Sequence, residues 1–145
     1  MKYENMKKDE LIAVIRQLAN EKMDSPPTVV QILRDMKIDY SRENFILIAL
    51  DNKLKILKKK LLFTGGVETS IVDMKVLLRE AITVKKCSGI IIAHNHPSNE
   101  CTPSQEDIVL TRRVVESCKM LGINFIDSLI FSEYSFLSMK EANYL

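Results

Sequence analysis

The sequence predicts an α/β fold, a single three-layer α-β-α domain built on a mixed β-sheet. Segments with apolar residues at helical spacing are interspersed with short, continuous apolar runs typical of buried strands. No internal repeat, low-complexity segment or linker divides the 145 residues, a length that suits one ordinary domain. Helices between buried strands are expected to cover both faces of the sheet. We therefore expect one domain over residues 1–145, with an N-terminal helical segment over about 1–40.

Two helices are expected in the N-terminal segment. Residues 8–22 carry apolar side chains at helical spacing, so this stretch is predicted to be an amphipathic helix. "MDSPPTVVQILRDMKI" (23–38) begins with Asp-Ser before Pro-Pro, a combination typical of a helix start. A short second helix is therefore expected there.

A hairpin and a third helix follow. "NFILIAL" (44–50) is continuously apolar, which is typical of a buried central strand, and the Asp51-Asn52 turn separates it from a second strand over 54–63. The next apolar residues recur at helical spacing and predict a helix over roughly 73–85: Met74, Leu77, Leu78, Ala81 and Ile82.

The remaining elements complete the sheet. "SGIIIAH" (88–94) is short, apolar and β-branched, as expected of a third buried strand. Residues 103–121 are predicted to form a long helix that ends at Gly122, because glycine readily adopts the left-handed conformation of a helix terminus. Two further strands are expected over 123–131 and 135–138.

Charge and cysteine content restrict the class of protein. A net charge of +2 is too small to indicate a nucleic-acid or membrane partner. The densest basic run, "KLKILKKK" (53–60), is interpreted as a strand with a solvated or edge-protecting lysine face. A phosphate-binding strip at Lys58, Lys59 and Lys60 is the alternative, and it supports a nucleic-acid partner only weakly.

The cytoplasm is the expected location. The three cysteines are an odd number and lack CxxC spacing, which suits a reducing compartment. Residues 1–22 are charged throughout and lack the apolar stretch of a signal peptide. No apolar run approaches the length needed to cross a bilayer, so no membrane association is expected.

The only two histidines of the chain, His94 and His96, lie one residue apart in "AHNHPSNECTPSQED" (93–107). Side chains alternate across a strand, so both imidazoles should point the same way and Asn95 the opposite way. Histidines at positions i and i+2 can share one metal ion, and catalytic zinc generally takes three protein ligands. The pair therefore predicts a metal site at the end of the 88–94 strand.

Asp107 is the best candidate for the third ligand, although it has a structural alternative. Ser104 and Asp107 have the spacing of a capping box, in which they would satisfy only amide groups of the helix. Thr102, however, suits the N-cap, with Pro103 at N1 and Gln105 at N3. If Thr102 caps the helix, Ser104 and Asp107 are free to face the ion from one side of the helix.

The pattern H-x-H, seven residues and S-x-x-D resembles the metal signature of the JAMM (JAB/MPN) metalloprotease family. "AHNHPS", "TPSQEDI" and "TRR" are similar to the RadC-like branch of that family, and the similarity extends from about Glu43 to "FIDSLIF". The length resembles that of short, single-domain RadC-like proteins, which lack the helix-hairpin-helix region of longer members. The resemblance implies a JAB/MPN fold with a cytidine-deaminase-like core.

The resemblance also implies roles for individual residues. His94, His96 and Asp107 would hold one Zn²⁺ ion, and Ser104 would donate a hydrogen bond to the oxyanion of a tetrahedral intermediate. The family needs a glutamate upstream, and Glu43 in "SREN" takes that position as general base. Glu68 in "GGVETS" remains a second candidate for the base.

The chain departs from the family pattern at Glu68, where related proteins tend to carry a small polar residue, and in two further places. Asn99 replaces the glycine of "HNHPSG", and the turn is expected to survive because Asn tolerates positive φ. Asp127-Ser128 stands where the family often has Asp-His, which would weaken support for a ligand or substrate.

These observations together with the resemblance predict a zinc-dependent hydrolase, a peptidase or isopeptidase acting on an unidentified protein or peptide. A cytidine deaminase would need H-x-E followed by P-C-x-x-C, which is absent, and a literal His-Asn-His does not reproduce an HNH nuclease. A zinc-containing binding or scaffold module remains the alternative, as does an accessory role in DNA repair that rests on the RadC name alone.

Overall fold

The computed structural model describes residues 7–18, 22–65 and 72–145. Its five-stranded sheet has the order β2-β1-β3-β4-β5. The only parallel neighbours in it are β3 and β4, so the sheet is mixed, as predicted. The strands are β1 (Glu43–Leu50), β2 (Ile56–Gly65), β3 (Gly89–Asn95), β4 (Asn124–Phe131) and β5 (Phe136–Ser138).

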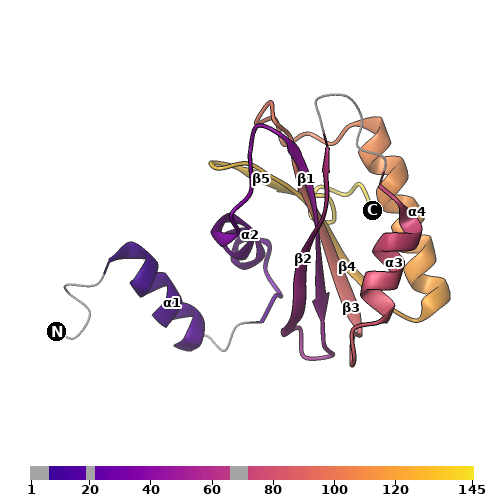
Figure 1. The fold of residues 1–145 in the computed structure, drawn as a ribbon, viewed down its shortest axis with the longest axis horizontal. Helices are drawn as coiled ribbons and strands as arrows, with labels where there is room; N and C mark the ends of the chain where they lie inside the picture. Colours follow the sequence, from indigo (N-terminus) through magenta and orange to yellow (C-terminus); the bar gives the residue numbers. More distant parts are fainter. Residues whose placement is uncertain (1–6, 19–21, 66–71) are drawn as a thin grey trace.

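Helices cover both faces of this sheet, which confirms the three-layer α/β architecture. Figure 1 shows α2 on one face and both α3 and α4 on the other. Each face has its own cluster of buried apolar side chains, one centred on Leu33 of α2 and the other on Leu77 of α3 and Val114 of α4. The helices are α1 (Lys8–Leu18), α2 (Pro26–Asp35), α3 (Met74–Ile82) and α4 (Gln105–Leu121).

The central strands β1 and β3 are buried almost throughout. All of β3 and all of β1 except Glu43 lie in the interior, which explains why both sequences are continuously apolar. Each strand sends alternate side chains to the two faces: Ile46 and Ile91 pack on the α2 side, Leu47 and Ile92 on the α3 and α4 side. The polar residues at the ends of these strands therefore divide between the two faces as well.

Three lysines of the basic run, Lys58, Lys59 and Lys60, lie on the edge strand β2. Lys58 and Lys60 pair with the carboxylate of Glu80 in α3, at 2.9 and 2.7 Å. Hydrogen bonds from these two lysines lower the pKa of Glu80 to about 2. This pairing fits the interpretation of a sheet edge lined by lysines. Of the three lysines on β2, two already have an acidic partner within the fold.

The N-terminal helix α1 stands apart from the α/β layers in Figure 1. Its apolar side chains Leu11 and Ile15 are 38% and 56% exposed, so these two residues of the predicted apolar face are not buried against described residues. The layers consist of α2 and the described elements that follow it. None of the helices in the described part of the chain is long and apolar enough to span a membrane.

Candidate metal centre

Strand β3 brings His94 to the end of the face covered by α3 and α4. The imidazole is almost fully buried and stacks on Phe45 of β1, with ring centroids 6.2 Å apart. His96 follows just after the strand, and its Nε2 lies 3.1 Å from Nε2 of His94. Asn95 points to the other face, where its side chain contacts Asn44 and Arg42. The predicted alternation of the three side chains is therefore confirmed.

The ring of His96 is held by the loop that follows it. Its Nδ1 lies 2.7 Å from the carbonyl oxygen of Glu100. A carbonyl can only accept, so Nδ1 carries the proton, and Nε2 of a neutral ring then presents its lone pair to the site. In His94 it is Nδ1 that is buried without a hydrogen-bond partner among the described residues, while Nε2 faces the cluster.

Helix α4 begins with the capping box that the sequence offered as the structural alternative for Ser104 and Asp107. Ser104 is the N-cap, its hydroxyl accepts from the backbone N–H of Asp107 at 3.1 Å, and its own N–H donates to Asp107 Oδ2 at 2.8 Å. The expectation that Thr102 caps the helix, with Pro103 at N1 and Gln105 at N3, is therefore wrong. The Ser104–Asp107 pair prevails because it satisfies two otherwise unpaired backbone donors reciprocally.

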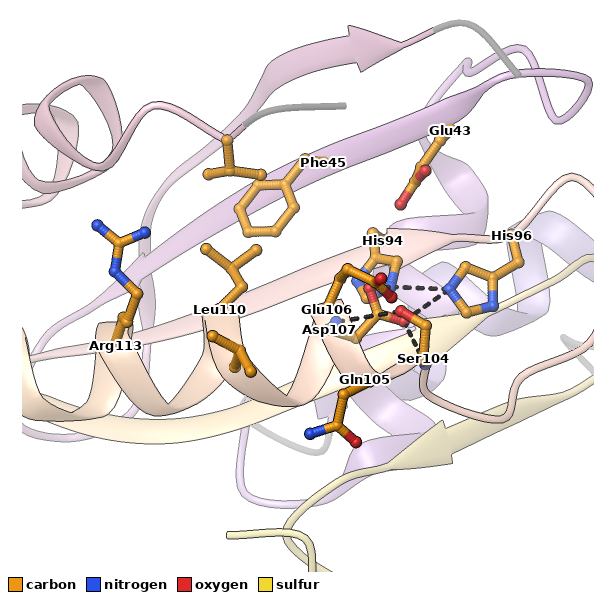
Figure 2. A pocket seen from close by; sticks show the side chains of 12 residues that line it. Glu43, Phe45, His94, His96, Ser104, Gln105, Glu106, Asp107, Leu110 and Arg113 are labelled. Atoms are coloured by element: carbon orange, nitrogen blue, oxygen red, sulfur yellow. Dashed lines mark hydrogen bonds and ion pairs between the residues drawn. The ribbon is translucent and has the colours of Figure 1, made fainter. Parts of the chain in front are cut away.

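Asp107 nevertheless faces both histidines while it caps the helix. Its Oδ1 lies 3.2 Å from His94 Nε2, and its Oδ2 lies 3.0 Å from His96 Nε2. Capping and metal binding are therefore not alternatives for Asp107. Its carboxylate caps the helix and faces the two histidines at the same time. Figure 2 shows His94, His96, Ser104 and Asp107 gathered at one end of the pocket and joined by dashed contacts.

Glu43, the first residue of β1, completes the cluster. One ligand atom from each of Glu43, His94, His96 and Asp107 lies within 4.8 Å of the others. In Figure 2 the Glu43 carboxylate points from β1 toward His94. The second candidate for the base, Glu68, lies outside the residues that the structure describes.

The donor set and its spacing fit a zinc ion. Two ligands at zinc-nitrogen distances of about 2.0–2.1 Å on a tetrahedral ion stand about 3.3–3.4 Å apart. The contacts of His94, His96 and Asp107 with one another measure 3.0–3.2 Å, close to that separation. Imidazole nitrogens and a carboxylate oxygen are zinc ligands in catalytic sites. These residues form a group able to hold a metal ion.

The charges of the cluster hold Asp107 ionised. Burial by itself raises the pKa of Asp107, but hydrogen bonds and attraction from His94 and His96 outweigh it and bring this pKa well below its usual value. The hydrogen bond to Asp107 is the main cause that raises the pKa of His96 above its ordinary value, against the opposing effect of burial. Asp107 is therefore a carboxylate at neutral pH, as a metal ligand must be.

The cluster opens into a pocket of about 700 Å³. Ser104 lines this pocket, and because its oxygen accepts the Asp107 N–H, its own proton remains available for donation. Phe45, Leu110 and Arg113 also line the pocket, and none of these was anticipated from the sequence. The available signal was helical spacing, since Leu110 and Arg113 follow Asp107 by three and six residues on α4.

Two of the departures from the family pattern, at Asn99 and at Asp127-Ser128, lie within the described residues. Asn99 adopts a left-handed conformation with φ of 65°, which supports the expectation that Asn can replace glycine in this turn. Ser128 accepts a hydrogen bond from Thr111 of α4 at 3.4 Å, and the Asp127 carboxylate accepts from the Ser138 hydroxyl and two backbone N–H groups. Neither residue hydrogen-bonds to the cluster.

Comparison with known proteins gives consistent matches over this region. A family described as RadC-like JAB domain matches residues 23–144. A UPF0758 protein of Clostridium perfringens is 40% identical over 131 residues, which cover 90% of this chain and 57% of the relative. The UPF0758 protein YsxA of Bacillus subtilis is 35% identical over 140 residues, 94% of this chain and 60% of the relative.

A UPF0758 protein of a Geobacillus strain is 38% identical over 114 residues, 79% of this chain and 50% of the relative. The chain thus spans between half and three fifths of the length of these curated relatives. Their names state neither an activity nor a substrate.

Proposed function

Because the chain belongs to the RadC-like JAB domain family, we propose that it is a zinc-dependent metallohydrolase with peptidase or isopeptidase activity. The observation that carries this proposal is the convergence of Glu43, His94, His96 and Asp107 within 4.8 Å, at one end of a pocket large enough for a substrate. The substrate is proposed to be a protein or peptide, and the cytoplasm remains the predicted location.

His94, His96 and Asp107 would hold the ion. Their three ligand atoms come from a strand, the residue after it and the first turn of a helix, so the backbone fixes all three. When bound, zinc would supply Lewis acidity, polarising the substrate carbonyl and lowering the pKa of a water molecule toward neutrality. Three protein ligands leave a coordination position for this chemistry.

Glu43 would move the proton of the attacking water. Its carboxylate lies within 4.8 Å of the ligand atoms and projects from β1, across the pocket from the start of α4. A carboxylate there can accept the proton as general base and return it to the leaving amine as general acid. Glu43 is only partly buried, so it can exchange protons with solvent between turnovers.

Ser104 would stabilise the negative charge that develops on the carbonyl oxygen. The capping interaction with Asp107 fixes the hydroxyl oxygen at the pocket wall. Since that interaction uses the oxygen as an acceptor, the hydroxyl hydrogen can be donated to the oxyanion.

Metal content and turnover of a Glu43→Gln variant test this proposal together. The purified protein should bind about one zinc per chain, and the variant should bind zinc equally well while losing at least about 100-fold in peptide hydrolysis. Absence of bound zinc in the wild-type protein would end the proposal. Full turnover by Glu43→Gln would instead assign the base to Glu68, which a Glu68→Gln variant would then check.

Binding without catalysis is the second candidate for the metal site. A firmly bound zinc ion together with failure to cleave a broad peptide and isopeptide panel would favour a scaffold module. The structure offers less support for a nucleic-acid partner, because Lys58 and Lys60 already pair with Glu80. An accessory role in DNA repair stays a prediction from the family name.

A further inference from the structure

The pocket extends along α4 from the candidate metal ligands to the positively charged side chain of Arg113. Figure 2 shows the His94–His96 pair at one end, the Arg113 guanidinium at the other, and the side chains of Phe45 and Leu110 between them. Val72 adds a further apolar wall. A substrate lying in this pocket would therefore meet the cluster first, then apolar side chains, and finally a positive charge.

Arg113 is the only lysine or arginine among the described residues that line this pocket, and it forms no ion pair with another described residue. At the opposite end lie three carboxylates, those of Glu43, Glu106 and Asp107. Their three negative charges exceed the two positive charges of a divalent cation by one. That end of the pocket therefore stays negative when the metal is bound. An anionic group on a substrate is accordingly repelled from one end and attracted to the other.

The position of Arg113 on the helix sets the distance between the two ends. Arg113 follows Asp107 by six residues, which at the rise of an α-helix separates their backbones by about 9 Å. An extended peptide covers that distance in about three residues. The intervening apolar walls can accept small apolar side chains of such a segment.

We propose that Arg113 is a specificity-determining residue, which binds a carboxylate on the substrate about three residues from the scissile amide. This inference rests on the proposed hydrolase function, because the distance to the bound carboxylate is counted from the amide bond that is cleaved. A planar guanidinium binds a carboxylate through two parallel hydrogen bonds, which gives this end of the pocket geometric selectivity. The carboxylate is either an acidic side chain or the free end of a chain.

Hydroxamates with a variable far end test the inference by binding rather than by turnover. Suberic acid monohydroxamate places a zinc-binding group and a carboxylate at the two ends of an alkyl chain of matching extended length, and its methyl ester lacks the charge. Calorimetric titration of zinc-loaded protein should show about tenfold tighter binding of the acid than of the ester. An Arg113→Gln variant should bind both about equally.

The neighbouring arginine provides a matched control. Arg112 is exposed on the same helix but does not line the pocket, so Arg112→Gln removes the same charge and should keep the preference for the acid. If the wild-type protein binds acid and ester equally, or Arg113→Gln retains the preference, the Arg113 inference is wrong and the hydrolase proposal stands. Failure to bind zinc and every hydroxamate would overturn the hydrolase proposal, and the inference would fall with it.

Two peptide pairs distinguish the sources of the carboxylate. One pair is acetyl-Glu-Ala-Ala-hydroxamate and its Gln counterpart, in which the charge is on a side chain. The other is malonyl-hydroxamate-Ala-Ala with a free or an amidated C-terminus. A preference confined to the first pair and lost in Arg113→Gln assigns an acidic side chain, and one confined to the second assigns a chain terminus. No preference in either pair would contradict the inference.

Discussion

The two sides of one short segment, His94-Asn95-His96, carry polar groups of opposite character. On the α3 and α4 side, the Nε2 atoms of the two imidazoles and the carboxylate oxygens of Asp107 make contacts of 3.0–3.2 Å. On the α2 side, Asn95 Oδ1 accepts from the backbone and side-chain N–H groups of Asn44, at 2.9 and 3.0 Å. Asn95 Nδ2 in turn donates to the carbonyl of Arg42 at 2.9 Å.

The difference between the sides separates structure from function. Around Asn95 each buried donor has an acceptor, so the network is complete and needs no further group. Around His94 and His96 the network is incomplete, because the buried Nδ1 of His94 has no partner among the described residues and the other ligand atoms converge on one point, as they would around a cation. Equally buried polar residues can therefore be assigned to folding or to ligand binding by whether their donors and acceptors balance.

The largest effect on zinc binding and turnover is expected on the α3 and α4 side, at the histidines. A His94→Ala change removes a ligand, so zinc affinity should fall by more than the roughly 100-fold that the loss of a supporting residue costs, and hydrolysis should become undetectable. Elemental analysis after dialysis and a turnover assay measure this. Stoichiometric zinc in the variant would contradict the assignment of His94 as a ligand.

The Ser104 hydroxyl should have the next largest effect. Ser104→Ala is expected to lower turnover by about 100-fold through loss of an oxyanion donor. It should also cost about 1 kcal/mol of stability through loss of the cap of α4. Ser104→Thr keeps the hydroxyl and serves as the control in both assays. A variant that loses only stability would restrict Ser104 to capping.

On the α2 side, around Asn95, the expected effect is on stability alone. Asn95→Ala leaves the buried backbone N–H of Asn44 without its acceptor, at a cost of about 1–3 kcal/mol, while the carbonyl of Arg42 loses one of its two donors and keeps the Asn44 side chain. Urea denaturation measures the cost, and zinc analysis of the folded variant should still give about one ion per chain. Loss of zinc from a well-folded Asn95→Ala protein would remove the distinction between the two sides.

The smallest effect is a pH dependence of the metal-free protein. The raised pKa of His96 stabilises the fold fully below its ordinary value of 6.5, and this contribution is lost as pH rises through the folded-state pKa. The lowered pKa of Asp107 stabilises the fold above its ordinary value of 3.8, a contribution lost in acid. The Tm of metal-free protein should thus fall by a few degrees from pH 6 to 8, whereas His96→Gln should remove that slope.

Local patterns predicted the fold and the core of the candidate site. Strand alternation depends only on the backbone, so the common direction of His94 and His96 and the opposite direction of Asn95 were predictable. Continuous apolar runs likewise identified β1 and β3 as central strands. The cap of α4 was not predictable in the same way, because Thr102 and Ser104 both fit an N-cap and the choice depends on the reciprocal bonds of Asp107.

The rest of the pocket could not be predicted because its residues look structural in the sequence. Phe45 and Leu110 have the pattern of core residues, and only the tertiary arrangement turns their side chains to a cavity. Arg112 and Arg113 are adjacent, exposed and chemically identical. Their difference arises from the direction in which α4 packs on the sheet, since Arg113 lines the pocket and Arg112 does not.

The double engagement of Asp107 has an evolutionary consequence. If the proposed activity were lost in a descendant, either imidazole could be replaced without loss of a helix cap, whereas exchanging this acid would also break the capping box of α4. Among inactive relatives, the aspartate should therefore outlast the histidines, and its persistence by itself would be poor evidence that a relative is still an enzyme.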